Sequence, residues 1–132
     1  MSGPPISGRV WTIFSWVWMA GIVVSIVIAL SPFRFSFLEE VPLFGSLNLD
    51  MAMHVLSFAW YTAWLPMVFK TRTGVALAAL AVFQGGVVIE FLQMHIPYHR
   101  FSEIDILSNG VGCACGTLAG LLIRRRCTGR RD

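Results

Sequence analysis

Charged side chains are scarce in this chain of 132 residues, where Asp, Glu, Lys and Arg together occupy only 13% of the positions. A soluble globular domain usually carries about 25% of such residues. Hydrophobic residues reach 56% instead. This balance argues against a soluble enzyme or binding module and indicates a small integral membrane protein of one domain.

Cysteines are also few, and their positions argue against a disulfide framework or a thiolate metal site. Cys113 and Cys115 lie two residues apart in an apolar run, and Cys127 lies in a basic tail. Two residues along a helix turn the side chain by about 200°, so the first two thiols point to roughly opposite sides. We therefore expect small, reduced packing residues.

The chain lacks the signatures of two common kinds of catalytic site. It contains no Gly-x-Ser-x-Gly turn for a Ser–His–Asp triad and no His-Glu-x-x-His spacing for a zinc enzyme. His54, Glu90 and Asp105 are a plausible ligand set for a divalent cation. Without a supporting spacing, however, we predict no metal site and no cofactor.

Four long apolar runs predict an all-α membrane protein, a bundle of four transmembrane helices. The first run has 24 residues without a charge. At 1.5 Å per residue, such a helix can cross a hydrocarbon layer about 30 Å thick. Between the first two runs, residues 31–49 predict a long apolar loop without regular structure. The predicted helices cover residues 10–33, about 50–69, about 73–94 and 102–123.

Polar residues and prolines mark where these helices begin and bend. Asn48 or Asp50 can cap the start of the second helix. Ser102, followed by Asp105 three residues later, forms a variant capping box at the start of the fourth. Pro66 lies near the end of the second helix and is predicted to bend its final turn.

Basic residues are distributed unevenly between the two sides of the predicted bundle. Four spans bring both termini to one side, which then holds eight of the ten Lys and Arg residues, against Arg34 and Arg100 on the other. Because basic loops remain in the cytoplasm, both termini are predicted to be cytoplasmic and the protein to lie in the cell membrane. The net charge of +3 is thus explained by a membrane flank, and we expect no nucleic-acid partner. The predicted parts are a short cytoplasmic tail (1–9), a four-span domain (10–123) and a basic cytoplasmic tail (124–132).

Small residues recur on the third and fourth predicted helices. Gly112, Gly116 and Gly120 follow one another at four-residue intervals and form a stripe that lets another helix approach closely. We favour packing within the chain for this stripe, and a homo-oligomer through the same face is the alternative. Gly85 and Gly86 indicate a second close contact or a bend.

Polar residues gather at the outer ends of three predicted helices and in one outer loop. An ionised side chain in the hydrocarbon costs roughly 2.5–3.5 kcal/mol, so these residues are expected to face one another rather than lipid. Arg100 is expected to pair with one carboxylate and so to close the group. We predict one outward-facing polar cluster of Asp50, His54, Glu90, Gln93, Arg100, Asp105 and Asn109.

At these positions the chain resembles the VanZ-like membrane family, named after a protein associated with resistance to the glycopeptide antibiotic teicoplanin. The family pattern opens with Asp-Lys-x-x-His in one span. It continues with Glu-x-x-Gln, Pro-x-x-Arg, Ser-x-x-Asp, Asn and Gly-x-x-x-Gly. The second block is present here in full as Glu90, Gln93, Pro97, Arg100, Ser102, Asp105, Asn109, Gly112 and Gly116.

The first block of the pattern departs from the family at one position. It appears as Asp50 to His54, with Met51 where the family usually has Lys, so one positive charge is missing. The resemblance covers about residues 48–120. It implies a small protein of the cell envelope, and by resemblance alone a link to antibiotic resistance.

Three functions remain open from the sequence. In the first, the cluster binds an envelope lipid or a lipophilic ligand such as a glycopeptide-type antibiotic or a lipid-linked precursor. In the second, the protein is an enzyme acting on a lipid-linked headgroup, with Glu90 or Asp105 as acid or base and Arg100 as electrostatic stabiliser. In the third, the cluster only holds helices together in a structural subunit.

Overall fold

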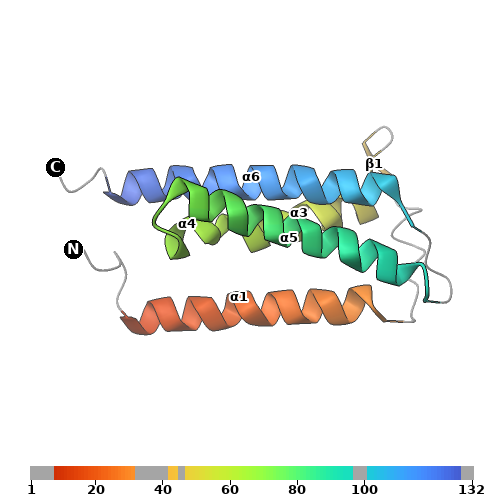
Figure 1. The fold of residues 1–132 in the computed structure, drawn as a ribbon, viewed down its shortest axis with the longest axis horizontal. Coiled ribbons are helices and arrows are strands. Elements are labelled where there is room, and N and C mark those ends of the chain that lie inside the picture. The colour runs from red at the N-terminus through yellow and green to blue at the C-terminus, as the bar shows by residue number, and fades with distance from the viewer. Residues whose placement is uncertain (1–7, 32–41, 45–46, 97–100, 129–132) are drawn as a thin grey trace.

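The computed structural model describes residues 8–31, 42–44, 47–96 and 101–128, and it is an all-α membrane protein with one small β-hairpin (Figure 1). Three of the helices are long and apolar enough to cross a membrane, and they cover Arg9–Ala29, Arg72–Gln93 and Glu103–Cys127. The helices are α1 (Gly8–Ala29), α3 (Leu49–Ala63), α4 (Leu65–Val68), α5 (Arg72–Gln93) and α6 (Glu103–Thr128).

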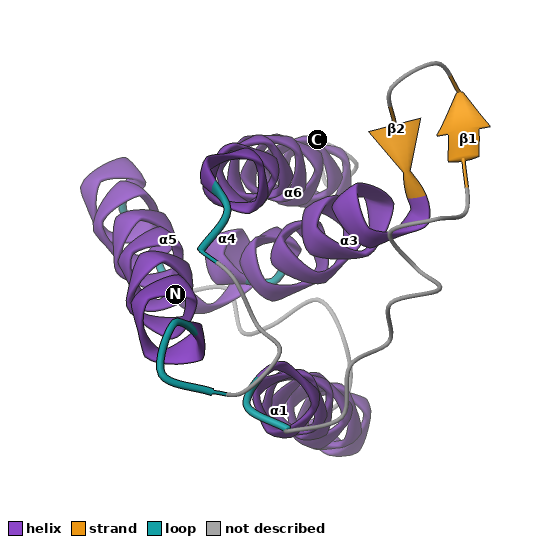
Figure 2. Ribbon diagram, turned by 90° about the vertical axis from the view of Figure 1, so that its right-hand side faces the viewer, coloured by secondary structure: helices purple, strands orange, loops and turns teal. Residues whose placement is uncertain are grey.

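The long helices run side by side, so that distant parts of the sequence meet at each end of the bundle. The start of α1 and the end of α6 lie at one end (Figure 1). The start of α3, the end of α5 and the start of α6 lie together at the other, which we call the site end (Figure 1). Seen from the site end, α3 lies between α1 and α6, with α5 to one side (Figure 2).

The second predicted helix is divided in two. We predicted one helix over about 50–69, whereas α3 ends at Ala63 and the short α4 begins at Leu65. Pro66, at the start of α4, has no N–H for the carbonyl of Thr62, and its ring would clash with that carbonyl in a continuous helix. With 15 residues, α3 alone is shorter than a membrane crossing.

Side-chain caps begin the helices where the sequence indicated. Asn48, rather than Asp50, caps α3, because its Oδ1 accepts a hydrogen bond from the Met51 N–H at 2.9 Å. Ser102 caps α6 by accepting a hydrogen bond from the Asp105 N–H at 3.2 Å. At the other end, α6 continues to Thr128, so the first residues of the predicted cytoplasmic tail are helical.

The glycine stripe of α6 packs on α3 of the same chain. A Cβ at Gly112, Gly116 or Gly120 would lie within 3.0 Å of a backbone carbonyl oxygen of α3. At Gly116 this oxygen is the carbonyl oxygen of Ala59. The stripe therefore brings two backbones into direct contact, as our favoured prediction had it. Gly112, Gly116 and Gly120 thus all contact α3 of the same chain.

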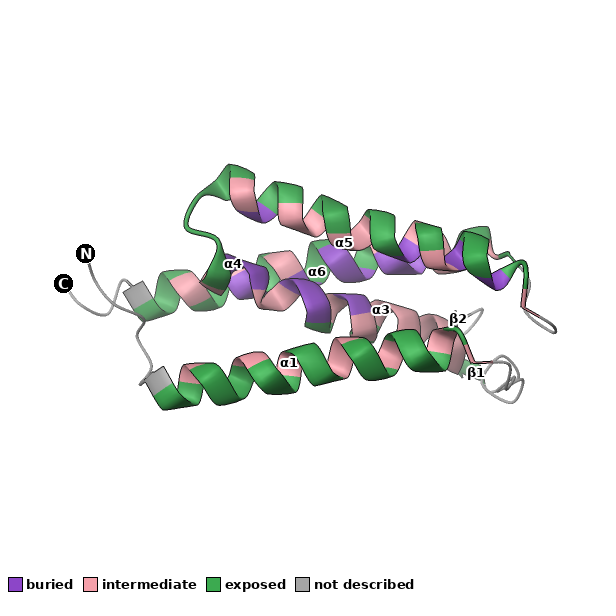
Figure 3. Ribbon diagram, turned by 60° about the horizontal axis from the view of Figure 1, so that its bottom comes forward, coloured by how far each residue is buried: buried purple, intermediate pink, exposed green. Residues whose placement is uncertain are grey.

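The buried core lies between α3, α5 and α6, and α1 adds to it only from one side. Phe58 and Tyr61 of α3 and Cys113 of α6 form its centre. Cys113 is thus a packing residue, as expected. By contrast, α1 has no buried residue and presents mostly exposed apolar side chains (Figure 3). It is attached through the indole N–H of Trp18, which lies 3.2 Å from the carbonyl oxygen of Tyr61.

The loop predicted over residues 31–49 contains regular structure. Strands β1 (Pro42–Phe44) and β2 (Leu47–Asn48) form an antiparallel pair next to the start of α3 (Figure 2). Only two residue pairs, Pro42 with Asn48 and Phe44 with Leu47, are formed in this hairpin, too few to give a periodic signal in the sequence. Residues 32–41 and 45–46 lie outside the described part of the chain.

Arg124 closes the bundle at the end opposite the site. Its guanidinium donates hydrogen bonds to the carbonyl oxygens of Pro66, Phe69 and Lys70 at 3.0, 2.9 and 2.8 Å. These carbonyls lie at the end of α4, where no following turn can satisfy them.

We expect Arg124→Ala to lower the free energy of unfolding by about 2 kcal/mol. Denaturant titration in detergent would measure this, with the exposed neighbour Arg126→Ala as control; equal losses in both variants would contradict the assignment.

Candidate functional site

Three helices bring their predicted polar residues together at the site end. Asp50 and His54 stand on the first turns of α3, and Asp105 and Asn109 on the first turns of α6. Glu90 lies in the last turn of α5 and points into the bundle, since only 2% of its surface is exposed. The convergence follows from the antiparallel order of the helices, which places two helix starts beside one helix end.

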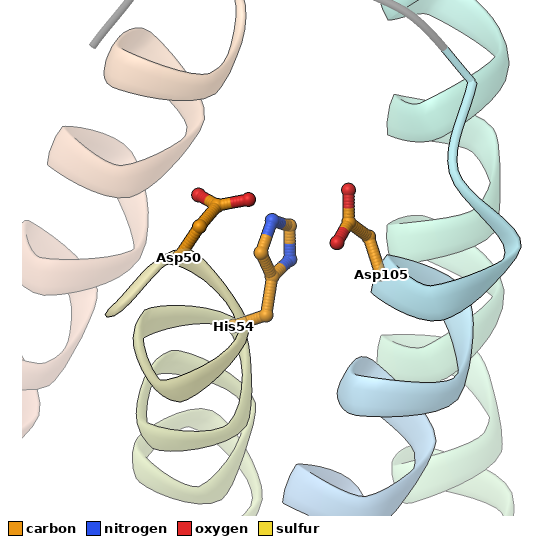
Figure 4. A group of neighbouring side chains, drawn as sticks. All are labelled: Asp50, His54 and Asp105. Carbon is orange, nitrogen blue, oxygen red and sulfur yellow. The ribbon is translucent and has the colours of Figure 1, made fainter. Parts of the chain in front are cut away.

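Asp50, His54 and Asp105 form a compact group open to the end of the bundle. One carboxylate oxygen from each acid and one ring nitrogen of His54 all lie within 4.8 Å of one another, and all three residues are half-buried. The imidazole stands between the two carboxylates, one from the start of α3 and the other from the start of α6 (Figure 4).

Asn109 fixes the orientation of the His54 ring. The Nδ1–H of His54 donates a hydrogen bond of 2.8 Å to Oδ1 of Asn109, whose side chain is 1% exposed. Asn109 fits there because Gly86 has no side chain, and a Cβ at Gly86 would press on both Asn109 and the Phe58 ring. The hydrogen bond leaves the second ring nitrogen, Nε2, with its lone pair.

Glu90 is the most deeply buried acid of the site, and its hydrogen bonding is incomplete. One bond comes from the backbone N–H of Ser102, the residue that caps α6. Its Oε2 is buried and has no hydrogen-bond partner among the described residues. The charged groups that act on the Glu90 carboxylate are Asp105 first, then His54 and Asp50. A buried acid without full partners is costly to a fold.

The Ser102–Glu90 bond changes the predicted capping box. In such a box the third residue of the helix, here Asp105, would return a bond to the N–H of the capping residue. In the structure Glu90 of α5 takes the Ser102 N–H instead. The Asp105 side chain is thereby directed to the group with His54 rather than to its own helix end (Figure 4).

Gln93 belongs to a different contact from the one predicted. Its Nε2 donates a hydrogen bond of 2.8 Å to the carbonyl oxygen of Ala29, the last residue of α1. The sequence predicted Gln93 as a member of the polar cluster. In the structure it attaches the end of α1, whose last carbonyls have no partner within the helix.

Arg100, predicted to close the cluster, lies outside the described residues, as does Pro97. Among the residues that are described, every Lys and Arg is far from the site end. They lie at the start of α1, around the turn before α5 and at the end of α6 (Figure 1). These residues are Arg9, Lys70, Arg72, Arg124, Arg125 and Arg126.

An apolar groove begins one helical turn below the cluster, between α5 and α6. On α6, Cys113 and Thr117 line it and continue the row that begins with Asp105 and Asn109. On α5, Phe83 lines it one turn before Gly86. The complete lining is Ala79, Leu80, Phe83, Cys113, Ala114, Thr117, Leu118 and Leu121. Sequence reasoning did not find this groove, because it depends on the separation between α5 and α6.

The site end therefore holds a half-buried acid–histidine group from α3 and α6 and a buried acid from α5, and an apolar groove between α5 and α6 begins one turn away. The acid and base candidates Glu90 and Asp105 are neighbours, as the sequence predicted. The arrangement can hold a cation or a polar headgroup at the bundle end with an apolar chain beside it. No family model, no characterised protein and no solved structure matches the chain.

Proposed function

We propose that the chain binds an envelope lipid, or another lipophilic ligand, with its polar part at the cluster and its apolar part in the groove between α5 and α6. The observation that carries the proposal is that the cluster and the groove lining share one row of residues, spaced four apart, on α6. Asp105 and Asn109 lead into Cys113 and Thr117 along one face of α6. A molecule with a polar head and an apolar chain matches this order.

The proposal includes four membrane crossings with both termini in the cytoplasm. Besides the three long helices, α3 and α4 together run from Leu49 to Val68. That length equals the roughly 20 residues of a crossing. The excess of Lys and Arg at the end of the bundle opposite the site supports the cytoplasmic membrane and an outward-facing cluster.

The incomplete bonding of Glu90 favours a ligand site over a purely structural contact. A cluster that serves only to join helices would be expected to satisfy its buried polar atoms. Oε2 of Glu90 has no partner among the described residues. Unsatisfied groups of this kind are kept where a bound molecule supplies the missing partner.

The resemblance to the VanZ-like family supports the same class of ligand. A lipophilic glycopeptide-type antibiotic or a lipid-linked precursor divides into a polar and an apolar part, as a membrane lipid does. The shared chemistry is thus a polar headgroup on a long apolar chain.

Blocking the groove tests the proposal separately from the cluster. We expect native mass spectrometry of the wild-type protein to show a lipid adduct. Asp105→Asn, at the headgroup, and Ala114→Phe, which fills the groove, are each expected to reduce its occupancy at least tenfold, roughly the effect of 1.4 kcal/mol. Ala119→Phe adds the same ring on an exposed part of α6 outside the groove and is the matched control. Equal adducts on all four proteins would contradict the proposal.

A further inference from the structure

We infer that Asp50, His54 and Asp105 bind a divalent transition-metal ion, with Zn²⁺ as the best-suited species. The inference goes beyond lipid binding and does not depend on it. The sequence predicted no metal site, and the ligand set considered from it was His54, Glu90 and Asp105. The inferred site differs on both points, because it binds a metal ion and contains Asp50 in place of Glu90. The structure brings Asp50 into the set because it lies one helical turn before His54 on the face of α3 that meets α6.

The geometry of the three donors is close to that of a bound ion. Donors at about 2.0–2.2 Å from Zn²⁺ lie roughly 3.4 Å apart in a tetrahedral site. Here all donor atoms lie within 4.8 Å of one another. Rotation of the two short Asp side chains, which are only half-buried, can supply the remaining contraction. The half-buried position also gives an ion access from the end of the bundle.

The hydrogen bond from His54 to Asn109 prepares the ring for a metal. A ligating histidine usually donates its other ring N–H to a carbonyl or carboxylate, which fixes the tautomer and the ring orientation. Asn109 Oδ1 accepts from Nδ1–H at 2.8 Å and is itself held in a buried position. Nε2 then carries the lone pair that a metal ion would accept.

Glu90 is a second, independent indication that a cation belongs here. Its buried Oε2 lacks a hydrogen-bond partner among the described residues, and its strongest electrostatic neighbour is Asp105. Three carboxylates therefore act on one another around a single imidazole. Neighbouring negative charges repel in a poorly solvated site, and a divalent ion held by Asp50, His54 and Asp105 would lower that repulsion.

The mixed donor set selects the type of ion. Mg²⁺ and Ca²⁺ prefer sites made of oxygen donors alone, whereas an imidazole nitrogen suits Zn²⁺ and related transition metals. Three protein donors leave a fourth position for water or a ligand oxygen, as in sites that bind exogenous molecules. If the proposed lipid function holds, a headgroup phosphate would be a suitable fourth donor.

Titration of the complete, detergent-solubilised protein with Zn²⁺ alone tests the inference without any lipid. After treatment with a chelator and its removal, calorimetry is expected to show one saturable site per wild-type chain. We expect Asp105→Asn and Asp50→Asn to weaken binding more than tenfold. Asn109→Ala removes the hydrogen bond that supports the His54 ring, without removing a proposed metal ligand, and is expected to weaken binding about 10–100-fold.

Two controls decide between this site and general attraction to acids. Glu103→Gln removes an exposed carboxylate from the same first turn of α6 and is expected to leave Zn²⁺ affinity unchanged. Circular dichroism establishes that each variant keeps its helix content. If one of the two isosteric Asp→Asn variants does not fold, the other still tests the loss of a carboxylate ligand. Absence of saturable binding to the wild type, or equal binding by all variants, would overturn the inference. Binding that appears only in Arg100→Ala would also overturn it, because the guanidinium would then be the natural cation of the cluster.

Discussion

Replacing Gly116 by alanine is expected to lower the free energy of unfolding by about 3 kcal/mol, the upper range for overpacking a tight contact. The new methyl group would meet the backbone carbonyl oxygen of Ala59 and the hydroxyl of Thr62. Neither can give way cheaply, because the first belongs to the α3 backbone and the second is fully buried and bonded to the Phe58 carbonyl. Reversible unfolding in mixed micelles would measure the loss.

Gly85→Ala is the matched control for this prediction. A Cβ at Gly85 has no neighbour within 4 Å. Alanine within a helix is favoured over glycine by roughly 0.5–1 kcal/mol, so this variant should be as stable as the wild type or more so. A Gly116→Ala protein as stable as the Gly85→Ala protein would show that α3 and α6 are not in backbone contact.

Glu90→Gln is expected to stabilise the metal-free protein by about 1–3 kcal/mol, the cost of leaving a buried polar group unsatisfied. The amide keeps one oxygen to accept the Ser102 N–H and replaces the unpartnered Oε2 by an uncharged N–H donor, in a site where Asp105 is the strongest electrostatic neighbour. It also removes one of three neighbouring acids. Stability gained by removing a functional group is typical of binding sites, where the fold tolerates strain. Thermal unfolding in detergent with a chelator present would detect the gain.

The sign of this change separates a binding site from a structural contact. If the cluster only joins helices, Glu90→Gln would weaken the contact between α5 and α6 and lower stability. Glu103→Gln, at an exposed position on α6, is the control and should change stability by no more than about 0.5 kcal/mol. Addition of Zn²⁺ should then stabilise the wild type more than Glu90→Gln, because the variant brings one acid fewer to the ion.

Local signals in the sequence were sufficient for the three long helices and for the helix starts. Apolar runs of about 20 residues announce α1, α5 and α6, since a membrane crossing requires that length of any helix. Asn48 and Ser102 were predictable as caps because a cap bonds to an N–H only two or three residues away. The proline that divides the second helix acts on its own backbone and is equally local.

The meeting of the polar residues was predictable at the level of helix ends. Antiparallel helices with short connections place a helix start beside a helix end, so Asp50, Glu90 and Asp105 were expected at one depth. The glycine stripe indicated a close contact as well. Neither the polar helix ends nor the glycine stripe identifies which side chain or helix each residue contacts. Hydropathy reports only that a residue lies near an interface or a neighbour.

The partner of each side chain was decided by the tertiary structure alone. Gln93 lies one turn after Glu90, yet its amide bonds to α1 while Glu90 faces the cluster. Asp50, not Glu90, completes the donor set with His54 and Asp105. These outcomes depend on the rotation of each helix about its axis and on helix separations of a few ångströms. For α3 and α6, the contact between Gly116 and the α3 backbone limits both quantities, and it joins residues more than 50 positions apart, beyond the reach of any local pattern.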